Sequence, residues 1–321
     1  MKVTAVTSVR NEAPFLLEWV MYNRLIGFTD IVVYFNDCSD GTDLVARALA
    51  DVGLITAIEN KGLPDVAPQV AAFMQARMVE EVRGADWAIA IDVDEFINIK
   101  CGDGKLSDLF EAVPGADAVM MQMRHFGSSH RVFMQDDLVL NQFSLASYET
   151  HPDNAIVKTI HRMGSHFRAI GMHMPFFFEK YQNSPQLYNG SGQLVPESIH
   201  RYERNRKVPD GWAGMNLVQL NHYAVRSLDQ YLVKRRRGSG TGMKNRFSKE
   251  YWQQRDANDV LETSIQRMVP RLQRELDATL SIPTVREAVE RARKLNDIEV
   301  MFAIRDAPPF AFNIAKSKGE V

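Results

Sequence analysis

Three acidic residues close a strongly apolar run in the segment DWAIAIDVDEFINIK, which covers residues 86–100. Side chains two residues apart on a β-strand point to the same face, so Asp92 and Asp94 would repel each other unless a cation lay against both. Mg²⁺ and Mn²⁺ prefer oxygen ligands of this kind and leave coordination positions for phosphate. D-x-D patterns also occur as solvated strand ends or helix caps. The functional interpretation of this pattern therefore depends on the buried strand that precedes it. The segment predicts a divalent metal site, with Glu95 beside it.

A histidine and a basic cluster form a second group of candidates, in the segment LNHYAVRSLDQYLVKRRRG over residues 220–238. His222 ends a predicted strand over 216–223, where it either packs as an ordinary strand histidine or provides the third ligand of a Mn²⁺ site. The basic residues 234–237 follow on a predicted helix that begins at Ser227 with a capping box. Their charges can neutralise a diphosphate, although helical spacing places at most two of the four on one face.

Strand and helix patterns alternate over the first third of the chain, and this alternation predicts the scaffold for both groups. The expected strands cover 2–9, 30–35, 54–60, 86–97 and 116–123, and the expected helices cover 12–26, 40–52, 68–83 and 107–112. Alternation at this spacing is typical of a mostly parallel, Rossmann-like α/β sheet with helices on both faces. Ligands of such sheets bind beyond the carboxyl ends of the strands.

Polar side chains follow two further strand ends of this predicted sheet. Arg10, Asn11 and Glu12 come after the first strand, and Asp37 and Asp40 come after the second. The residues around Asp37 and Asp40 also have the composition of a turn followed by a helix cap, and both roles fit the same edge of the sheet. The sequence therefore predicts one ligand site at the edge that also holds the D-x-D pair.

Composition excludes several classes of protein. The chain has 321 residues, of which 45% are apolar, and a formal net charge of −2, which suits a soluble protein with a sizeable core. The near balance of charge and the absence of a nucleic-acid motif argue against nucleic acid as a partner. Cys38 and Cys101 form no metal or disulfide pattern. With no signal peptide and no apolar run near the ~20 residues that span a bilayer, we expect a cytoplasmic protein, with peripheral membrane contact left open.

The quoted blocks together resemble the family-2-like glycosyltransferases of the GT-A fold, in particular a bacterial branch with the signatures R-N-E, N-D-x-S-x-D-G-T, D-x-D-E-F and N-H-Y. In this chain they read VRNEAP, FNDCSDGT, IDVDEF and LNHY, in the family's order, within 9–97 and 216–238. The resemblance implies a GT-A-like fold and a metal-dependent transfer of sugar from a nucleotide-sugar donor to a hydroxyl acceptor. It favours a UDP-sugar as donor, a glycan as acceptor, and Mn²⁺ or Mg²⁺ as cofactor.

The resemblance also implies roles for single positions of this chain. The residues near the base of the nucleotide would be Arg10, Asn11 and Glu12. The residues near the base and the ribose would be Asp37 and Asp40. The metal site would contain Asp92, Asp94 and His222, with Asp94 as the direct ligand, and the diphosphate would face Lys234 and Arg237.

The catalytic base is less closely specified. An inverting enzyme needs a group that deprotonates the acceptor hydroxyl, whereas a retaining enzyme does not. We expect Asp94, Glu95 and His173 to take part in catalysis. Other side chains that fit the role of base are Glu149, His166 and Glu179.

The rest of the chain divides into an irregular part and a helical part. Residues 125–215 are rich in His, Gly and aromatic residues without a sustained period, which indicates loops that build an acceptor site over the sheet. From about 257 to 296 the pattern is helical, with a break at Pro270. The expected division is a catalytic domain over 1–245, with a nucleotide-sugar half over about 1–125 and an acceptor and metal half over about 126–245, and a helical C-terminal extension over 246–321.

Two alternatives to a glycosyltransferase are left open. Nucleotidyltransferases also place acidic metal ligands on an α/β sheet, but they usually carry a glycine-rich basic loop after the first strand, and this strand ends in VRNEAP. The second alternative is a catalytically inactive relative that binds a nucleotide sugar. The intact set of Asp92, Asp94 and His222 argues against that loss of activity.

Overall fold

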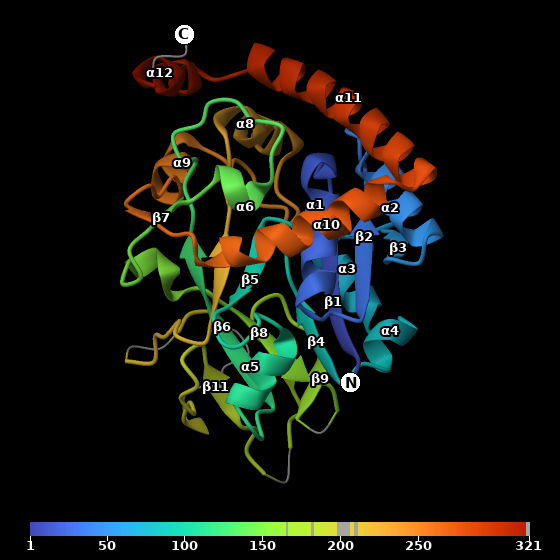
Figure 1. Ribbon diagram of the computed structural model, residues 1–321, viewed down its shortest axis with the longest axis vertical. Coiled ribbons are helices and arrows are strands. Elements are labelled where there is room, and N and C mark those ends of the chain that lie inside the picture. Colours follow the sequence, from blue (N-terminus) through green and yellow to red (C-terminus); the bar gives the residue numbers. More distant parts are fainter. Residues whose placement is uncertain (165, 181–182, 198–205, 209–210, 319–321) are drawn as a thin grey trace.

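The computed structural model describes residues 1–164, 166–180, 183–197, 206–208 and 211–318. Its centre is a nine-stranded sheet with the strand order β3-β2-β1-β4-β8-β6-β12-β5, and β11 pairs with β6. Figure 1 shows helices around this sheet. The predicted fold class, a mostly parallel α/β sheet between layers of helices, is confirmed. The sequence RYERNRK at 201–207 is also basic, and its residues 201–205 lie outside the described residues.

The first four strands of the sheet separate two hydrophobic cores. These parallel strands are β1 (Val3–Val9), β2 (Asp30–Phe35), β3 (Thr56–Glu59) and β4 (Trp87–Ala90). The helices between them are α1 (Ala13–Ile26), α2 (Thr42–Asp51), α3 (Pro68–Ala76) and α4 (Glu80–Arg83). Ala5 belongs to the core that contains α1 and α2, and Val6 to the core that contains α3 and α4. The two-residue period of a strand thus assigns neighbouring side chains to opposite layers.

The other half of the sheet mixes strand directions. Its strands are β5 (Glu95–Ile99), β6 (Ala118–His125), β8 (Val157–Arg162), β11 (Leu187–Asn189) and β12 (Val218–His222). β8 is antiparallel to β4 and to β6, β12 is parallel to β6, and β5 is antiparallel to β12. It follows that β1, β2, β4, β6 and β12 all end at the same edge of the sheet.

Short elements and loops occupy much of the segment between β6 and β12, as the irregular pattern of 125–215 predicted. They include α6 (Val139–Gln142), β7 (Leu145–Ala146), η1 (Pro152–Ala155), β9 (Phe167–Ala169) and β10 (Phe176–Phe177). Two further short elements are α5 (Leu106–Ala112), which follows β5, and β13 (Val260–Leu261), which pairs with β7.

Helices from the C-terminal part of the chain complete the main core. They are α8 (Leu228–Arg237), α9 (Lys249–Arg255), η2 (Ser264–Met268), α10 (Val269–Leu280), α11 (Pro283–Arg305) and α12 (Pro309–Ser317). α10 packs on α1, and α11 packs on α2 and α8, which Figure 1 shows as two orange-red helices beside the blue ones. Leu272, Leu276 and Val285 share the core that contains Trp19. Most of the described residues beyond 246 are helical, apart from the short strand β13 and its flanking loops, and α10 and α11 bury apolar surface against the first helices of the chain.

Two predicted elements are each divided in the structure. The strand expected over 86–97 is two strands, because the chain turns after β4 and the Glu95 amide donates to the Asp92 carbonyl over 3.0 Å. The continuous apolar pattern concealed this turn. The helix expected over 68–83 is divided into α3 and α4, because Val79 has an extended backbone.

The start of α8 also differs from its prediction. No capping box forms: the hydroxyl of Ser227 donates to Oδ1 of Asp229 over 2.5 Å and accepts no backbone amide of the first turn. Oδ1 of Asp229 accepts the Gln230 amide over 2.7 Å, so Asp229 satisfies part of the helix start in place of the predicted box.

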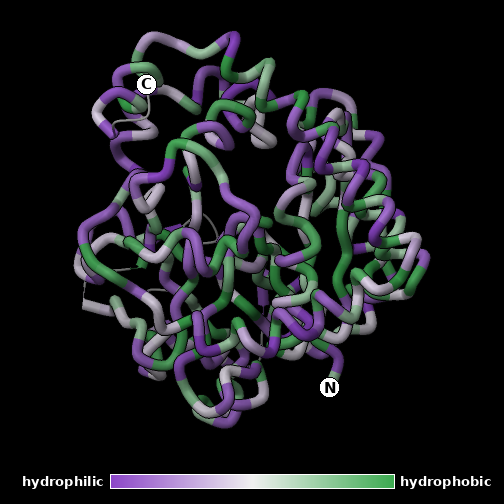
Figure 2. Tube along the Cα trace, turned by 45° about the horizontal axis from the view of Figure 1, so that its top comes forward, coloured by the Kyte–Doolittle hydropathy of each residue, from purple (hydrophilic) through white to green (hydrophobic). Residues whose placement is uncertain are grey.

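The distribution of polar residues agrees with a globular chain. Figure 2 shows hydrophobic residues along the inner strands and hydrophilic residues over much of the outer loops and helices. Among the described residues, no helix combines the length and the apolar character needed to cross a membrane. Both cysteines are free thiols, as their spacing predicted.

Candidate active site

The turn between β4 and β5 lies at the edge where the parallel strands end. Asp92 and Asp94 occupy this turn. The pairing of β12 with β6 and β5 sets His222 beside His125 on one side and beside Glu95 on the other. Segments more than a hundred residues apart in the sequence therefore meet at one edge, as the strand-end argument predicted.

Each acid of the D-x-D pair has its own lysine. Because the pair lies in a turn, the strand geometry assumed for it, with both carboxylates on one face, does not apply. Asp94 contacts Lys234 of α8, and Asp92 contacts Lys158 of β8. The negative charge that looked unbalanced in the sequence is balanced in the fold by these two cations.

Asp94 is a buried acid at this edge, with 7% of its surface exposed. Its Oδ2 accepts a hydrogen bond from Lys234 Nζ at 2.5 Å and lies 3.7 Å from His222 Nε2. Lys234 also donates to the carbonyl of Ala224 over 2.9 Å, so its ammonium is held from two sides. Burial alone would raise the pKa of Asp94, but Lys234 and His222 hold it well below its ordinary value. Asp94 is therefore an anion at neutral pH.

His222 is flanked by a second imidazole and by an arginine. The ring centroids of His125 and His222 lie 5.1 Å apart, and Arg255 Nη1 lies 2.6 Å from His125 Nε2. The same Nε2 also lies 3.1 Å from the Asp153 carbonyl; because a guanidinium only donates and a carbonyl only accepts, each tautomer of His125 serves one of these two partners. Burial lowers the pKa of both histidines, which are neutral at pH 7. A neutral imidazole has one nitrogen lone pair, the feature that a metal ligand needs.

Asp92 is held by three neighbours. Its Oδ2 lies 3.3 Å from Lys158 Nζ, and its Oδ1 accepts a hydrogen bond from Gln69 over 2.7 Å. Its backbone amide donates to Glu95 Oε2 over 2.9 Å, and the same carboxylate oxygen lies 3.3 Å from Lys158 Nζ. Burial raises the pKa of Glu95 to about 8, although Lys158 opposes this shift. Glu95 is 1% exposed, so a role as base would require it to leave this enclosure.

Glu12 belongs to a buried ion cluster. Its Oε2 accepts from Arg226 Nη1 over 2.8 Å, and its Oε1 accepts from Arg237 Nη2 over 2.5 Å. Arg226 also donates to the Val93 carbonyl over 3.2 Å, and its guanidinium lies 3.4 Å from the centre of the Phe15 ring. Burial alone would raise the pKa of Glu12, but Arg237 and Arg226 lower it below its ordinary value. This cluster ties the end of β1 to the D-x-D turn and to α8.

Arg237 is engaged with the chain itself. Besides Glu12, its guanidinium donates to the backbone carbonyls of Arg10 and Asn11. Asn11 in turn exchanges two side-chain hydrogen bonds with Ser39, each 2.9 Å long. The predicted diphosphate contact of Arg237 and base contact of Glu12 therefore require these side chains to exchange partners when a ligand binds. The side chain of Arg10 is exposed.

Asp37 and Asp40 have different surroundings. Asp40 is fully buried, and its carboxylate accepts the amides of Ala13 and Thr42 over 2.9 Å each. Those amides begin α1 and α2, so Asp40 caps two helices at once. Asp37 is exposed, has a backbone φ of 45° and accepts a hydrogen bond from the Asn36 side chain. Of the two acids, Asp37 is the one whose carboxylate faces solvent.

The predicted bases are scattered. Half-buried His173 contacts the Val157 carbonyl through Nδ1 at 2.9 Å, and burial, with help from Lys158, lowers its pKa to about 4. The other three candidates lie elsewhere. Glu149 pairs with Arg124 and Lys100, His166 lies 3.6 Å from Asp117 at the opposite edge of the sheet, and Glu179 is exposed. His173 is the candidate base that the fold brings near Asp92.

Besides His125 and Arg255, which flank His222, the residues of the site that were not predicted are Gln69, Lys158 and Arg226. The segment VKTIHR around Lys158 does carry a signal, because a lysine inside a run of strand-forming residues is expensive to bury unless an acid meets it. Arg226 follows the N-H-Y block directly, but only the fold shows that it reaches Glu12.

Residues 3–194 match the model of glycosyltransferase family 92, which is more than half of the chain. The chain belongs to glycosyltransferase family 92. The matched part includes Asp92 and Asp94 and ends before β12. A family 92 protein of Ricinus communis is 36% identical to this chain over 97 residues, which are 30% of the chain and 17% of that protein. The chain therefore spans a small part of this relative. Membership of a glycosyltransferase family, which the sequence blocks implied, is confirmed, and family 92 is the model that matches.

Solved structures give distant likenesses of this family 92 chain. The mannosyltransferase PcManGT from Pyrobaculum calidifontis, in complex with GDP-Man and Mn²⁺, has 14% identity and a TM-score of 0.36, over 99% of this chain and 79% of that one. TarS 1–349 from S. aureus, in complex with UDP-GlcNAc, has 12% identity and a TM-score of 0.30, over 50% of this chain and 45% of that one. GDP-Man, Mn²⁺ and UDP-GlcNAc are ligands of those two proteins.

Two side chains at this edge, Asp94 and His222, are of types that bind metal ions in proteins. Within the described ranges, no group of three His, Cys, Asp or Glu side chains is arranged to hold a metal ion. Asp92 contacts Lys158, whereas Oδ2 of Asp94 lies 3.7 Å from His222 Nε2 and also accepts a hydrogen bond from Lys234. One carboxylate oxygen and one neutral imidazole nitrogen are suitable ligands for Mn²⁺ or Mg²⁺ when phosphate and water complete the shell. The donor set therefore fits a divalent ion that is shared with a phosphate-bearing ligand.

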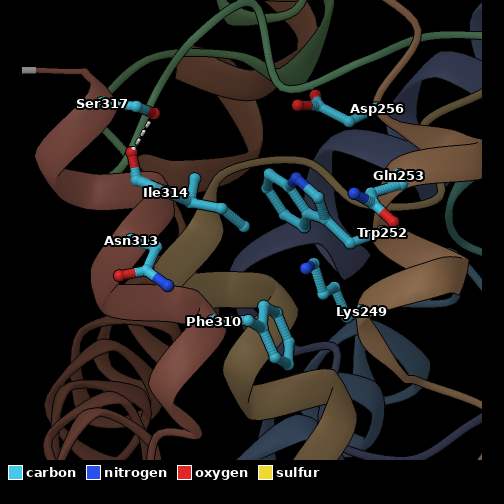
Figure 3. A pocket seen from close by; sticks show the side chains of 8 residues that line it. All are labelled: Lys249, Trp252, Gln253, Asp256, Phe310, Asn313, Ile314 and Ser317. Carbon is cyan, nitrogen blue, oxygen red and sulfur yellow. Dashed lines mark hydrogen bonds between the residues drawn. The ribbon is translucent and has the colours of Figure 1, made fainter.

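A cavity of about 310 Å³ lies between α9 and α12. Figure 3 shows Trp252 and Ile314 pointing toward each other across it. Trp252 is only 3% exposed, because its ring also packs against Tyr231, with centroids 4.9 Å apart. Of the described residues that line this cavity, none is a predicted site residue, so the cavity is separate from the edge site.

Proposed function

We propose that this family 92 chain is a glycosyltransferase that moves a sugar from a nucleotide-sugar donor, a UDP-sugar in first place, to a hydroxyl of a glycan. One observation carries the proposal. Oδ2 of Asp94 lies 2.5 Å from Lys234 Nζ and 3.7 Å from His222 Nε2, at the edge where the parallel strands end. An anion, a cation and a neutral imidazole thus meet where such sheets bind nucleotides. Family membership supports the class of reaction.

The site's charges suit the departure of a nucleoside diphosphate. Negative charge develops on the diphosphate as the bond to the sugar breaks, and fixed positive groups stabilise it. Lys234 supplies one such group, held in place by Asp94 and the Ala224 carbonyl. Asp94 and His222 would hold a Mn²⁺ or Mg²⁺ ion, which supplies Lewis-acid stabilisation of the same charge. Asp94 thereby has a direct part in catalysis.

The nucleotide would lie over the ends of β1 and β2. Asp37 and Arg10 are exposed there and are available to a ligand without rearrangement. Asn11, Glu12 and Arg237 support this surface from below through the hydrogen bonds described above, and Asp40 fixes the two helices that begin beside it.

His173 is the proposed base for the acceptor hydroxyl. Its Nδ1 donates to the Val157 carbonyl, which leaves the lone pair on Nε2. The lowered pKa keeps the ring neutral and able to accept a proton, but it also makes His173 a weak base at neutral pH. Glu95 is proposed to orient the D-x-D turn through its bond to the Asp92 amide.

Isothermal titration of the full chain with UDP, GDP and the corresponding nucleotide sugars, with and without Mn²⁺, tests the proposal. We expect UDP to bind in the presence of Mn²⁺ and Asp94→Asn to weaken this binding roughly 100-fold, because one partner of a buried charge group is lost. The matched control is Asp136→Asn, which removes an exposed carboxylate that pairs with Arg293. If no nucleotide binds, or if Asp94→Asn binds like the wild type, the proposed donor site is wrong.

Turnover is a separate question from binding. Release of free sugar from a bound UDP-sugar, followed by anion-exchange chromatography of the UDP product, distinguishes an active enzyme from an inactive binder. A protein that binds UDP with Mn²⁺ and never cleaves a donor would be the inactive relative that the sequence left open.

A further inference from the structure

Lys158 is a buried lysine in the middle of the sheet. Its side chain is 1% exposed, and it belongs to β8, between β4 and β6. β8 pairs with β4 in antiparallel register, with His161 opposite Ala88. Continuing this register sets Lys158 opposite Ile91, one residue before Asp92. The lysine therefore comes from a strand that neither the D-x-D block nor the N-H-Y block includes.

Two carboxylates meet this ammonium. Nζ lies 3.3 Å from Oδ2 of Asp92 and 3.3 Å from Oε2 of Glu95. The two acids differ in exposure, because the Asp92 side chain is 32% exposed and the Glu95 side chain is 1% exposed. Glu95 thus forms the inner end of the network, and Asp92 forms its outer end at the edge of the sheet.

Further hydrogen bonds hold Asp92 and Glu95 in place. Glu95 accepts the Asp92 amide, and the Glu95 amide donates to the Asp92 carbonyl, so backbone and side chain close a small ring at the turn. Gln69, at the start of α3, holds the other oxygen of the Asp92 carboxylate over 2.7 Å. Both oxygens of Asp92 are therefore occupied by donors from other elements of the fold.

We propose that Lys158 is a positioning residue: it fixes the Asp92 carboxylate at the edge of the sheet and serves as the cation for that acid. A divalent ion at the site would then have Asp94 and His222 as its protein ligands, and Asp92 would face the donor as an oriented acceptor of hydrogen bonds. The first part of this proposal, that Lys158 positions Asp92, does not depend on the proposed function. The second part, the roles of Asp92, Asp94 and His222 toward the ion and the donor, rests on the proposed function.

Removing Lys158 by itself would leave a buried acid without its partner, which is strongly destabilising. The test variant is therefore Lys158→Met with Glu95→Gln, since glutamine can still accept the Asp92 amide and methionine fills the space of the lysine stem. The matched control is Lys100→Met, which removes a lysine from the far end of β5, where its ammonium pairs with Glu149. Thermal unfolding monitored by circular dichroism shows that each variant is folded.

A crystal structure of the double variant decides the first part. We expect the Asp92 carboxylate to leave its wild-type position, because Gln69 alone then holds it, and we expect no such change in Lys100→Met. An Asp92 carboxylate that keeps its place in the double variant overturns the positioning role.

Mn²⁺ binding to the full chain, measured by electron paramagnetic resonance of the free ion, decides the second part and does not depend on folding of the double variant. We expect Asp92→Asn to change the Kd for Mn²⁺ by less than about threefold and Asp94→Asn to raise it roughly 100-fold. Equal losses in both variants would show that Asp92 is a metal ligand and overturn the assignment. If the wild type binds no Mn²⁺, the proposed metal site fails and the second part fails with it, while the crystal structure still decides the role of Lys158.

Discussion

Nζ of Lys234 lies 2.5 Å from Oδ2 of Asp94, and this contact joins the last turn of α8 to the turn before β5. Asp94 is the acid that we propose as a ligand of a divalent ion. Such an ion would bind beside this lysine, at Oδ1 or Oδ2 of the same carboxylate, or displace it. The pair therefore links the binding of a metal to the binding of a diphosphate, because a displaced ammonium would be free to contact the phosphate oxygens.

Replacement of the lysine separates the two binding events. In Lys234→Met we expect Mn²⁺ alone to bind about tenfold more tightly, since a positive charge beside the site is gone. We expect UDP at saturating Mn²⁺ to bind about tenfold less tightly, since a charge-assisted contact is lost. Titration calorimetry measures both constants. Arg235→Gln is the control, because Arg235 is exposed on the same helix. Unchanged constants for both ligands would contradict the link.

Arg226 is expected to matter for stability more than for the chemistry. It is buried, its backbone has a φ of 55°, and it contacts Glu12, Val93 and Phe15. In Arg226→Met, Glu12 keeps Arg237 but loses one of two cations, so we expect a loss of roughly 2–4 kcal/mol in the free energy of unfolding. Urea denaturation measures it. Arg291→Met, on the exposed side of α11, is the control and is expected to change stability by less than about 0.5 kcal/mol. An equal effect of both variants would count against the buried cluster.

The sequence predicted that the polar residues after several strands meet at one edge of the sheet, because this arrangement follows from local residue patterns. β-branched and apolar runs define β1, β2, β4 and β12, and parallel strands bring their carboxyl ends to one edge whatever the loops do. Asp94, His222 and Lys234 could therefore be placed together before any contact was known. The D-x-D turn was missed because Ile91 and Val93 continue the apolar pattern through it, and the bond that closes it is between backbone atoms.

Lys158 and Arg226 were beyond the reach of such reasoning for a different reason. Lys158 meets Asp92 only because β8 inserts antiparallel between β4 and β6, and strand order is not encoded in the spacing of residues along the chain. Arg226 reaches Glu12 across 214 positions of sequence. Pairings of this kind depend on the finished tertiary structure, so single-sequence patterns do not reveal them.

Glu18 gives the protein a predictable dependence of stability on pH. It is buried in α1, its carboxylate accepts the amides of Val139 and Leu140, and burial raises its pKa to about 7. A pKa raised from 4.5 in the unfolded chain means that the native state favours the protonated acid. The resulting stability is fully present below about pH 4.5 and is lost as the pH rises through 7, by roughly 3 kcal/mol.

Glu18→Gln does not titrate at this position, so its stability relative to the wild type is expected to rise between pH 5 and pH 8. Urea denaturation at each pH measures the difference. Glu111→Gln, which replaces an exposed acid on α5, is the control and should show no such trend. A difference between Glu18→Gln and wild type that is constant over this range would show that Glu18 has an ordinary pKa.

His173 is tested by a comparison of kinetic constants. If its Nε2 accepts the proton of the acceptor hydroxyl, His173→Gln is expected to lower kcat by about 10- to 100-fold and to leave the KM for the donor within about threefold. His130→Asn is the control, because His130 is exposed and has a backbone φ of 63°, a conformation that asparagine tolerates. A kcat that matches the wild type would assign the base elsewhere or favour a retaining reaction.

The contact between α2 and α11 is tested by two glycines that share a backbone conformation. Gly41 and Gly53 have φ values of 86° and 73°, so alanine is strained at both by a similar amount. A Cβ at Gly41 would lie 2.8 Å from the Cα of Ala292, whereas a Cβ at Gly53 would have nothing within 4 Å. Gly41→Ala is therefore expected to lower the free energy of unfolding by about 1–3 kcal/mol more than Gly53→Ala, as measured in urea. Equal losses would mean that α11 does not pack this closely against the start of α2, and that the C-terminal helices are less firmly joined to the first helices of the chain than their shared core implies.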